Sequence, residues 1–149
     1  MRRFSICIAA AALLASSTAT AQGIPKSTDG TDPKAWDPNL DAVKAAAKNH
    51  RVIYEDEDVR VLSVTVEPGE VEVAHHHQWP SVIVFVSLTP SENRDAKGNL
   101  LPTTRPGETR EQPVVVRMPP QGAHAVTNKG TSAMRLIRIE YKKGFPEQP

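Results

Sequence analysis

Two stretches of the chain, residues 69–77 and 119–128, decide the fold. The first reads Gly-Glu-Val-Glu-Val-Ala-His-His-His, so that five residues separate the turn glycine Gly69 from three consecutive histidines. Valines at alternate positions predict a β-strand. Because strand side chains alternate between two faces, His75 and His77 should point to one side and His76 to the other. Two imidazoles directed to the same side provide half of a metal site.

The second stretch reads Pro-Pro-Gln-Gly-Ala-His-Ala-Val-Thr-Asn and places His124 directly after a predicted turn. If the two strands lie side by side, His75, His77 and His124 converge and form a three-histidine metal centre. Other interpretations stay open, because a histidine cluster can also be a solvated strand edge or a set of hydrogen-bonded core residues. His76 could also bind an ion in place of a neighbour.

Most of the remaining chain also has the pattern of β-structure. From residue 52 onward, β-branched residues recur with period two between short turn signals, which predicts an antiparallel sandwich or barrel. The polar segment 89–112 is expected to form a long hairpin or a loop over the barrel mouth, with its turn at 95–99. The predicted strands are Val52–Glu55, Val59–Val66, Val71–His77, Ser81–Leu88, Pro113–Met118, His124–Thr127 and Ala133–Tyr141.

The N-terminal third predicts three segments. Residues 1–21 have a basic start, an apolar run and a small-residue end, which is the layout of a secretory signal peptide. Residues 22–36 are rich in turn-forming and charged residues and predict a flexible tether. Residues 37–149 are expected to form a single domain, with one short helix that begins at Asp37 and Pro38. The protein is therefore expected to be periplasmic or secreted.

Charge and cysteine content limit the function classes. Without Arg2 and Arg3 of the leader, sixteen basic residues face seventeen acidic ones, so no electrostatic footprint for nucleic acid or a membrane surface is expected. The only cysteine, Cys7, lies in the leader, which excludes a disulfide or a thiolate ligand from the remaining chain. A small molecule is the expected partner. Apolar strands also suggest that two copies could pair as a homodimer through an exposed sheet.

The two decisive stretches resemble a known family. Gly69, five residues and the histidine run are similar to the first half of the first cupin motif, and residues 120–128 are similar to the second. Strand sequences at 59–62, 79–82 and 134–141 extend the similarity. Together they resemble small single-domain bacterial cupins of the RmlC-like jelly-roll superfamily. This resemblance implies an all-β, cupin-like antiparallel β-barrel (double-stranded β-helix or jelly roll) with one short N-terminal helix.

The chain departs from the cupin pattern at two places. Ser81 and Val82 stand where the first motif usually has a glutamate, so one carboxylate ligand is missing. Only Ala123 separates Gly122 from His124, where two residues are usual, so the shorter turn affects the direction of the third imidazole.

The resemblance also implies a chemistry. In a cupin, His75, His77 and His124 would resemble the facial three-histidine site of thiol and diketone dioxygenases. Three neutral ligands leave coordination positions open, which is typical of a working site and not of a structural one. The ion would be a divalent metal, with Fe, Mn, Ni and Zn not distinguished by the ligands. A dioxygenase for a small organic substrate and a non-catalytic binding protein for a small ligand or metal both stay open.

Several further residues are candidates for a place near the metal. Gln78, Trp79 and Phe85 are candidates for a substrate pocket, although a turn amide and packed aromatics explain them equally simply. Glu140 could replace the missing carboxylate if it pointed inward, but Ile139 and Tyr141 beside it predict that it faces water. His50 is predicted to be an ordinary residue at the junction of helix and strand.

Overall fold

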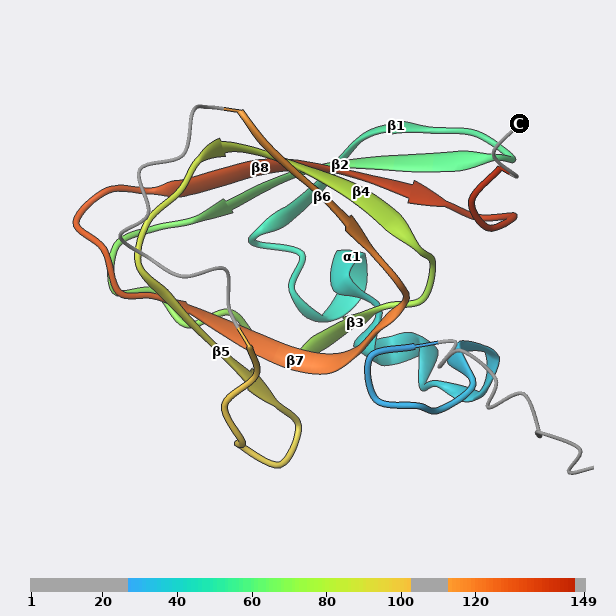
Figure 1. Ribbon diagram of the computed structural model, residues 1–149, viewed down its shortest axis with the longest axis horizontal. Coiled ribbons are helices and arrows are strands. Elements are labelled where there is room, and N and C mark those ends of the chain that lie inside the picture. Colours follow the sequence, from blue (N-terminus) through green and yellow to red (C-terminus); the bar gives the residue numbers. More distant parts are fainter. Residues whose placement is uncertain (1–26, 103–112, 147–149) are drawn as a thin grey trace, which may run out of the picture.

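The computed structural model describes residues 27–102 and 113–146, in which two antiparallel sheets face each other (Figure 1). The larger sheet has the order β1-β2-β8-β4-β6 and the smaller one β3-β7-β5. The predicted signal peptide lies outside the described residues. The strands are β1 (His50–Glu55), β2 (Val59–Val66), β3 (His75–His77), β4 (Ser81–Ser87), β5 (Ser91–Asp95), β6 (Val114–Met118), β7 (Gln121–Asn128) and β8 (Met134–Tyr141).

The centre of the larger sheet is the β2–β8 pair, which runs in register from Val59 opposite Tyr141 to Val66 opposite Met134. Along β2, every second side chain is buried between the sheets, as its period-two pattern predicts. The all-β jelly-roll fold class expected from the sequence is confirmed. The apolar core lies where Leu62, Val64 and Val66 meet residues of the neighbouring strands.

Most strand boundaries agree closely with the predicted ones, and those of β2 are identical. The prediction missed β5, whose sequence Ser-Glu-Asn-Arg-Asp has no apolar residue; pairing with β7 holds it in the sheet. The turn at 95–99 is confirmed, since the Asp95 carboxylate accepts hydrogen bonds from the backbone of Lys97 and Asn99. The predicted strand 71–77 is reduced to β3 and a single bridge between Val71 and Thr127.

The N-terminal segment packs on the sandwich, so residues 27–36 are not the flexible tether that the composition predicts. The Thr28 amide donates to the Pro120 carbonyl at 2.9 Å, and the Thr28 hydroxyl accepts from the Gly122 amide at 2.9 Å. A Cβ at Gly122 would meet the Asp29 side chain, so a larger residue here would require Asp29 to move. The segment thereby fixes the start of β7, which carries His124.

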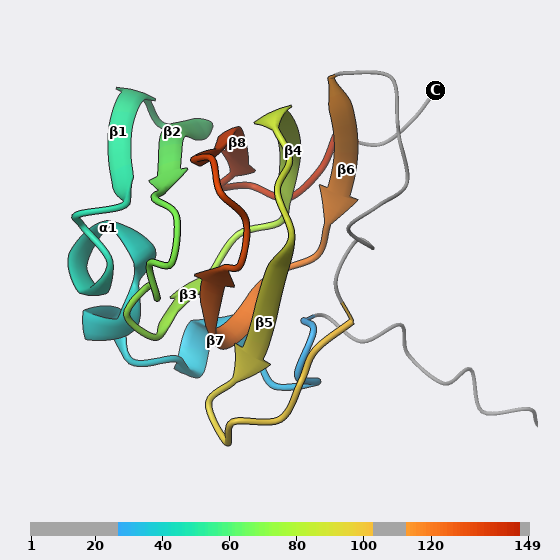
Figure 2. The ribbon, with the colours of Figure 1, turned by 90° about the vertical axis from the view of Figure 1, so that its left-hand side faces the viewer.

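Short helices close the side of the sandwich at which β1 and β3 lie (Figure 2). The helix expected from Asp37 is broken into the 3₁₀ turn η2 (Pro38–Leu40) and α1 (Ala42–Ala45), preceded by η1 (Pro33–Ala35). Asp37 and Asp41 cap the two later elements by accepting backbone hydrogen bonds. Ala42 is completely buried against the sheets. Among the described residues, no helix is long and apolar enough to span a membrane.

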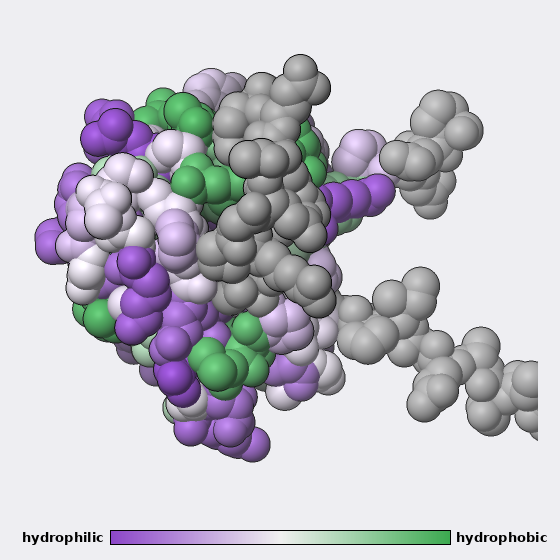
Figure 3. Space-filling model, turned by 60° about the vertical axis from the view of Figure 1, so that its left-hand side comes forward, coloured by the Kyte–Doolittle hydropathy of each residue, from purple (hydrophilic) through white to green (hydrophobic). Residues whose placement is uncertain are grey.

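The surface is mixed in character. On the face drawn in Figure 3, apolar residues form separate patches between polar ones. The edge strand β1 exposes Val52, Ile53 and Tyr54. Pairing of two copies through such an edge stays a prediction.

Candidate metal centre

Four histidine rings from three strands gather between the two sheets. His50 begins β1, His75 and His77 lie on β3, and His124 lies on β7. All four are buried, with exposed fractions of 5% or less. His50, His75 and His77 each offer a ligand nitrogen, and these nitrogens lie within 4.8 Å of one another. Because nitrogen ligands bind a zinc-like ion at about 2.0–2.1 Å, three buried histidines in this arrangement could hold a metal.

His124 is not one of these three residues, but its ring lies next to two of them. Its ring centroid is 4.7 Å from that of His75 and 5.7 Å from that of His77. His75 and His124 also face each other in the β3–β7 register, which explains why the two distant sequence stretches meet. The rings of His50 and His75 are equally close, at 4.5 Å.

In all four rings, Nδ1 has an acceptor oxygen nearby. Carbonyl and carboxylate oxygens can only accept, so Nδ1 carries the hydrogen and Nε2 keeps its lone pair. Metal-binding histidines usually have this arrangement, in which the second ring nitrogen donates to a fixed acceptor. The Nδ1 contacts are His50 to Ala46 O at 3.3 Å, His75 to Val73 O at 2.8 Å, His77 to Glu140 Oε1 at 2.8 Å and His124 to Gly122 O at 2.9 Å.

Burial keeps these imidazoles neutral at neutral pH. Loss of hydration lowers the pKa of His50 to about 3, that of His75 to about 4 and that of His124 to about 3. The pKa of His77 falls well below its ordinary value for the same reason. The rings therefore have the protonation state that a metal ion requires.

Glu140 is an inward-facing residue, so the prediction that it faces water is wrong. It is fully buried on β8, where its Oε1 accepts from His77 and its Oε2 accepts from Arg60 Nε at 2.6 Å. Burial raises the pKa of Glu140, and the two neighbouring arginines act in the opposite direction. Ser81, at the place of the usual cupin glutamate, lies opposite Glu140 in the β4–β8 register. A carboxylate from another strand thus lies next to this position, where it accepts from His77 and is not one of the grouped ligands.

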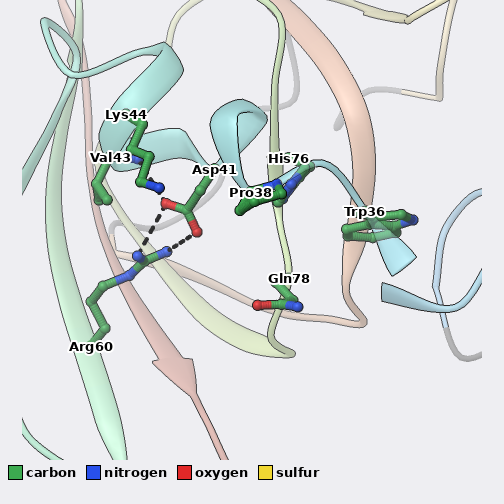
Figure 4. Close-up of a pocket in the computed structure, with 8 residues that line it drawn as sticks. All are labelled: Trp36, Pro38, Asp41, Val43, Lys44, Arg60, His76 and Gln78. Carbon is green, nitrogen blue, oxygen red and sulfur yellow. Dashed lines mark hydrogen bonds and ion pairs between the residues drawn. The ribbon is translucent and has the colours of Figure 1, made fainter. Parts of the chain in front are cut away.

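Arg60 connects this carboxylate to the N-terminal segment. Its two terminal nitrogens donate to the two Asp41 carboxylate oxygens, each at 3.1 Å (Figure 4). The ring of Trp79 covers the guanidinium, with 4.6 Å between the Arg60 Cζ and the ring centroid. Asp41, Arg60, Glu140 and His77 therefore form one continuous chain of hydrogen bonds.

Arg138 is the second buried arginine. Its Nη1 donates to Gln121 Oε1 at 2.5 Å, and its Nε lies 3.6 Å from Glu140 Oε1. Burial lowers the pKa of Arg138 to about 10, which leaves it charged at neutral pH. Glu72 lies near the same cluster, 3.7 Å from His50 Nδ1, and burial raises its pKa to about 8.

His50 is the candidate ligand that sequence reasoning missed. No local pattern in the sequence links His50 to the other histidines; the contacts of its ring with those of His75 and His77 place it in the cluster. The fifth histidine, His76, points away from the other rings, as strand alternation predicts, and it is also buried. Its Nε2 donates to the Asp37 carbonyl at 2.8 Å, and its ring lies 5.0 Å from that of Trp36.

The three residues considered for a substrate pocket lie in different surroundings. Gln78 lines a pocket of about 170 Å³ on the outer side of β3, with Trp36 and His76 (Figure 4). Trp79 lies over Arg60, as described above. Phe85 faces Leu136 and Val114 in the register of the larger sheet. Gln78, Trp79 and Phe85 therefore do not line one common pocket.

Comparison with known proteins identifies the fold. No protein-family model and no curated protein gives a significant match to the sequence. A cupin domain from Bordetella pertussis Tohama I is similar in structure, with 22% identity, a TM-score of 0.50 and coverage of 62% of this chain and 91% of that one. An RmlC-like cupin protein from Desulfovibrio desulfuricans matches with 20% identity, a TM-score of 0.40 and coverage of 70% and 94%. The chain has the cupin fold, and identities at this level show the fold alone.

Proposed function

We propose that the protein binds one divalent metal ion with the imidazoles between its sheets, through His75, His77 and His124, with His50 as a fourth candidate. The supporting observation is that every one of these rings directs Nδ1–H to a fixed acceptor and keeps Nε2 unprotonated. An all-imidazole set suits Fe, Ni, Zn or Cu. The bound ion would act as a Lewis acid toward a small ligand.

The reaction class proposed for this site is dioxygenation of a small organic molecule. The histidines are neutral, so they leave the full charge of the ion for a bound anion. Burial excludes water from the site, and Glu140 holds the orientation of His77 through Nδ1. A three-histidine set leaves coordination positions free for substrate.

A non-catalytic binding protein is the second candidate. The observation in its favour is that a fourth imidazole ring lies nearby, with both His50 and His124 beside His75, because four protein ligands close a tetrahedral site in the way that structural zinc sites are closed. Whether His50 is a ligand therefore separates the two candidates.

Metal content tests the site itself. The double variant His75→Ala/His124→Ala should lose the stoichiometric metal that elemental analysis finds in the unchanged protein. His76→Ala is the matched control, because His76 lies on the same strand with its ring on the opposite side, and it should keep one ion per chain. A double variant that retains the metal would rule out the proposed ligands.

Coordination and turnover separate the candidates. With cobalt in place of the natural ion, His50→Ala should leave the visible spectrum unchanged if His75, His77 and His124 are the ligands, and change it if His50 is a ligand; His124→Ala tells a four-histidine set from His50, His75 and His77. Protein loaded with iron under anaerobic conditions can then be screened for oxygen uptake with thiols, diketones and phenolic compounds. No uptake with any class supports the binding protein.

We also propose that the mature protein is exported and begins after Ala21. The support is the layout of residues 1–21. N-terminal sequencing of protein recovered from the periplasm or medium should give Gln22 as the first residue. An intact Met1 in the recovered protein would contradict export by this route.

A further inference from the structure

We propose that Arg138 binds the carboxylate of a small anionic ligand beside the histidine cluster. This inference rests on the proposed metal function and adds to it the chemical class of the ligand and the residue that selects it.

The first observation is that two nitrogens of the buried Arg138 side chain lack hydrogen-bond partners among the described residues. The side chain is 4% exposed, yet neither Nε nor Nη2 has a hydrogen-bond partner among the described residues. Only Nη1 is engaged, by Gln121. Buried N–H groups that stay unpaired are costly, so they indicate a partner that comes from outside the chain.

The second observation is the geometry of the two free nitrogens. Nε–H and Nη2–H lie along the same edge of the planar guanidinium and are roughly parallel. This edge matches the two oxygens of a carboxylate and gives a bidentate, charge-assisted pair. A lysine cannot provide that pattern, because its ammonium is a point charge.

The carboxylates of the chain do not fill this edge. Glu140 already accepts from His77 and Arg60, and its Oε1 is 3.6 Å from Arg138 Nε, beyond hydrogen-bond distance. Asp41 is engaged by the other two nitrogens of Arg60. Glu72 Oε1 has no hydrogen-bond partner among the described residues, so it does not accept from Arg138.

The charges of the interior favour an anion at this edge. Arg60 forms close ion pairs with Asp41 and Glu140, whereas Arg138 has one longer ion pair, with Glu140 at 3.6 Å, and Glu72 acts on it without a direct contact. A divalent ion on neutral imidazoles would add two more positive charges. Asp41 and Glu140 balance the charges of the two arginines, so the two charges of the ion are what an anion would compensate. Arg138 also lies close enough to the rings that its charge lowers the pKa of all four histidines.

Carboxylate binding to the metal-loaded protein tests this inference. Titration of the cobalt-loaded protein with oxalate, followed by calorimetry and by the visible spectrum, should give an affinity about 10- to 100-fold higher than that of Arg138→Gln, because charge-assisted hydrogen bonds are lost. Arg138→Lys should lose most of this affinity too, since it keeps the charge without the fork. Arg135→Gln removes an exposed arginine from the same strand and should bind as the unchanged protein does.

Two further ligands, imidazole and inorganic phosphate, test whether Arg138 selects a carboxylate. Imidazole, a neutral metal ligand, should bind equally to all four proteins. Inorganic phosphate should bind more weakly than oxalate, and an Arg138-dependent preference for phosphate would overturn the assignment to a carboxylate. If Arg138→Gln does not fold, Arg138→Lys carries the comparison.

The inference and the proposed function fail in different ways. Metal content is measured first for every variant. If the unchanged protein and the variants hold the metal but bind oxalate equally, the role of Arg138 is overturned and the metal site stands. If the unchanged protein holds no metal, the proposed function fails, and the ligand proposed here fails with it.

Discussion

The inward face of the larger sheet has two halves of opposite character. In the β2–β8 register, Val66 lies opposite Met134 and Val64 opposite Leu136, whereas Leu62 lies opposite Arg138 and Arg60 opposite Glu140. The side chains that alternate inward are therefore apolar at one end of the strands and charged at the other. Both halves lie between the same two sheets.

This difference separates stability from function. The apolar half contributes through burial of hydrocarbon, which stabilises the fold by about 25 cal/mol per Å². The charged half contributes little net stability, because desolvation of ion pairs offsets their attraction. Its residues instead hold histidines and leave Arg138 incompletely paired. The first half makes the sandwich, and the second makes the candidate site.

The largest expected difference between the halves is their response to acid. The folded pKa values of the four histidines lie below the unfolded value of about 6.5, so the unfolded chain binds more protons as pH falls. Stability should then be lost between about pH 6.5 and 4, by about 1.4 kcal/mol per pH unit for each histidine. The raised pKa values of Glu72 and Glu140 oppose this, that of Glu72 in the range from 8 to 4.5, but these are two groups against four histidines.

Unfolding of metal-free protein by urea at several pH values measures this effect. His124→Asn should reduce the slope, since one titrating group is removed. Met134→Leu, in the apolar half, should leave the slope unchanged. A flat profile in the unchanged protein would show that the rings are not buried in neutral form.

Glu140 gives the next largest effect. Glu140→Ala leaves Arg60 and His77 without their shared partner, which should lower the free energy of unfolding by about 3–5 kcal/mol. Glu140→Gln keeps the shape and the acceptor for His77, so its main effect should be a metal affinity lower by about 10- to 100-fold. Urea unfolding and metal competition titrations measure the two quantities. Unchanged affinity in Glu140→Gln would mean that the carboxylate does not orient His77.

Met134→Ala makes the corresponding change in the apolar half. Loss of buried hydrocarbon and the resulting cavity should lower the free energy of unfolding by about 3 kcal/mol. Metal stoichiometry, measured by elemental analysis, should stay at the value of the unchanged protein. Loss of metal in this folded variant would show that the two halves are coupled.

Trp79 gives the smallest effect, at the outer boundary of the charged half. Trp79→Leu removes the aromatic ring over the Arg60 guanidinium and should reduce the free energy of unfolding by about 0.5–1 kcal/mol. Thermal unfolding at neutral pH measures this change. Trp36→Leu is the comparison variant, because the Trp36 ring lies beside His76 and its removal leaves the Arg60 contact in place.

Much of the fold follows from local patterns. Period-two alternation and turn residues located β2 without error and most other strands closely, because these signals act over a few residues. Strand β5 was missed because its polar sequence carries no such signal and only pairing with β7 orders it. Residues 27–36 look flexible by composition, yet contacts with Pro120 and Gly122 hold them on the sandwich.

The candidate site shows the same division. The histidine run and the second stretch drew attention to His75, His77 and His124 because their spacing is a local pattern. His50 could not be found this way, since its only link to the others is the packing of β1 beside β3 and α1. Glu140 was assigned to water because its neighbours on β8 are apolar, and alternation does not tell which of two faces is inside when both charged and apolar residues occur.

Local patterns in the sequence set the class of fold and the alternation of side chains along each strand, because backbone sterics and side-chain alternation act over a few residues. The folded arrangement alone shows which charged residues are buried and which of them meet. That depends on contacts between residues tens of positions apart, such as His77 with Glu140 and Arg60 with Asp41. These contacts form when the sheets close over them, and they turn a run of histidines into a candidate metal centre.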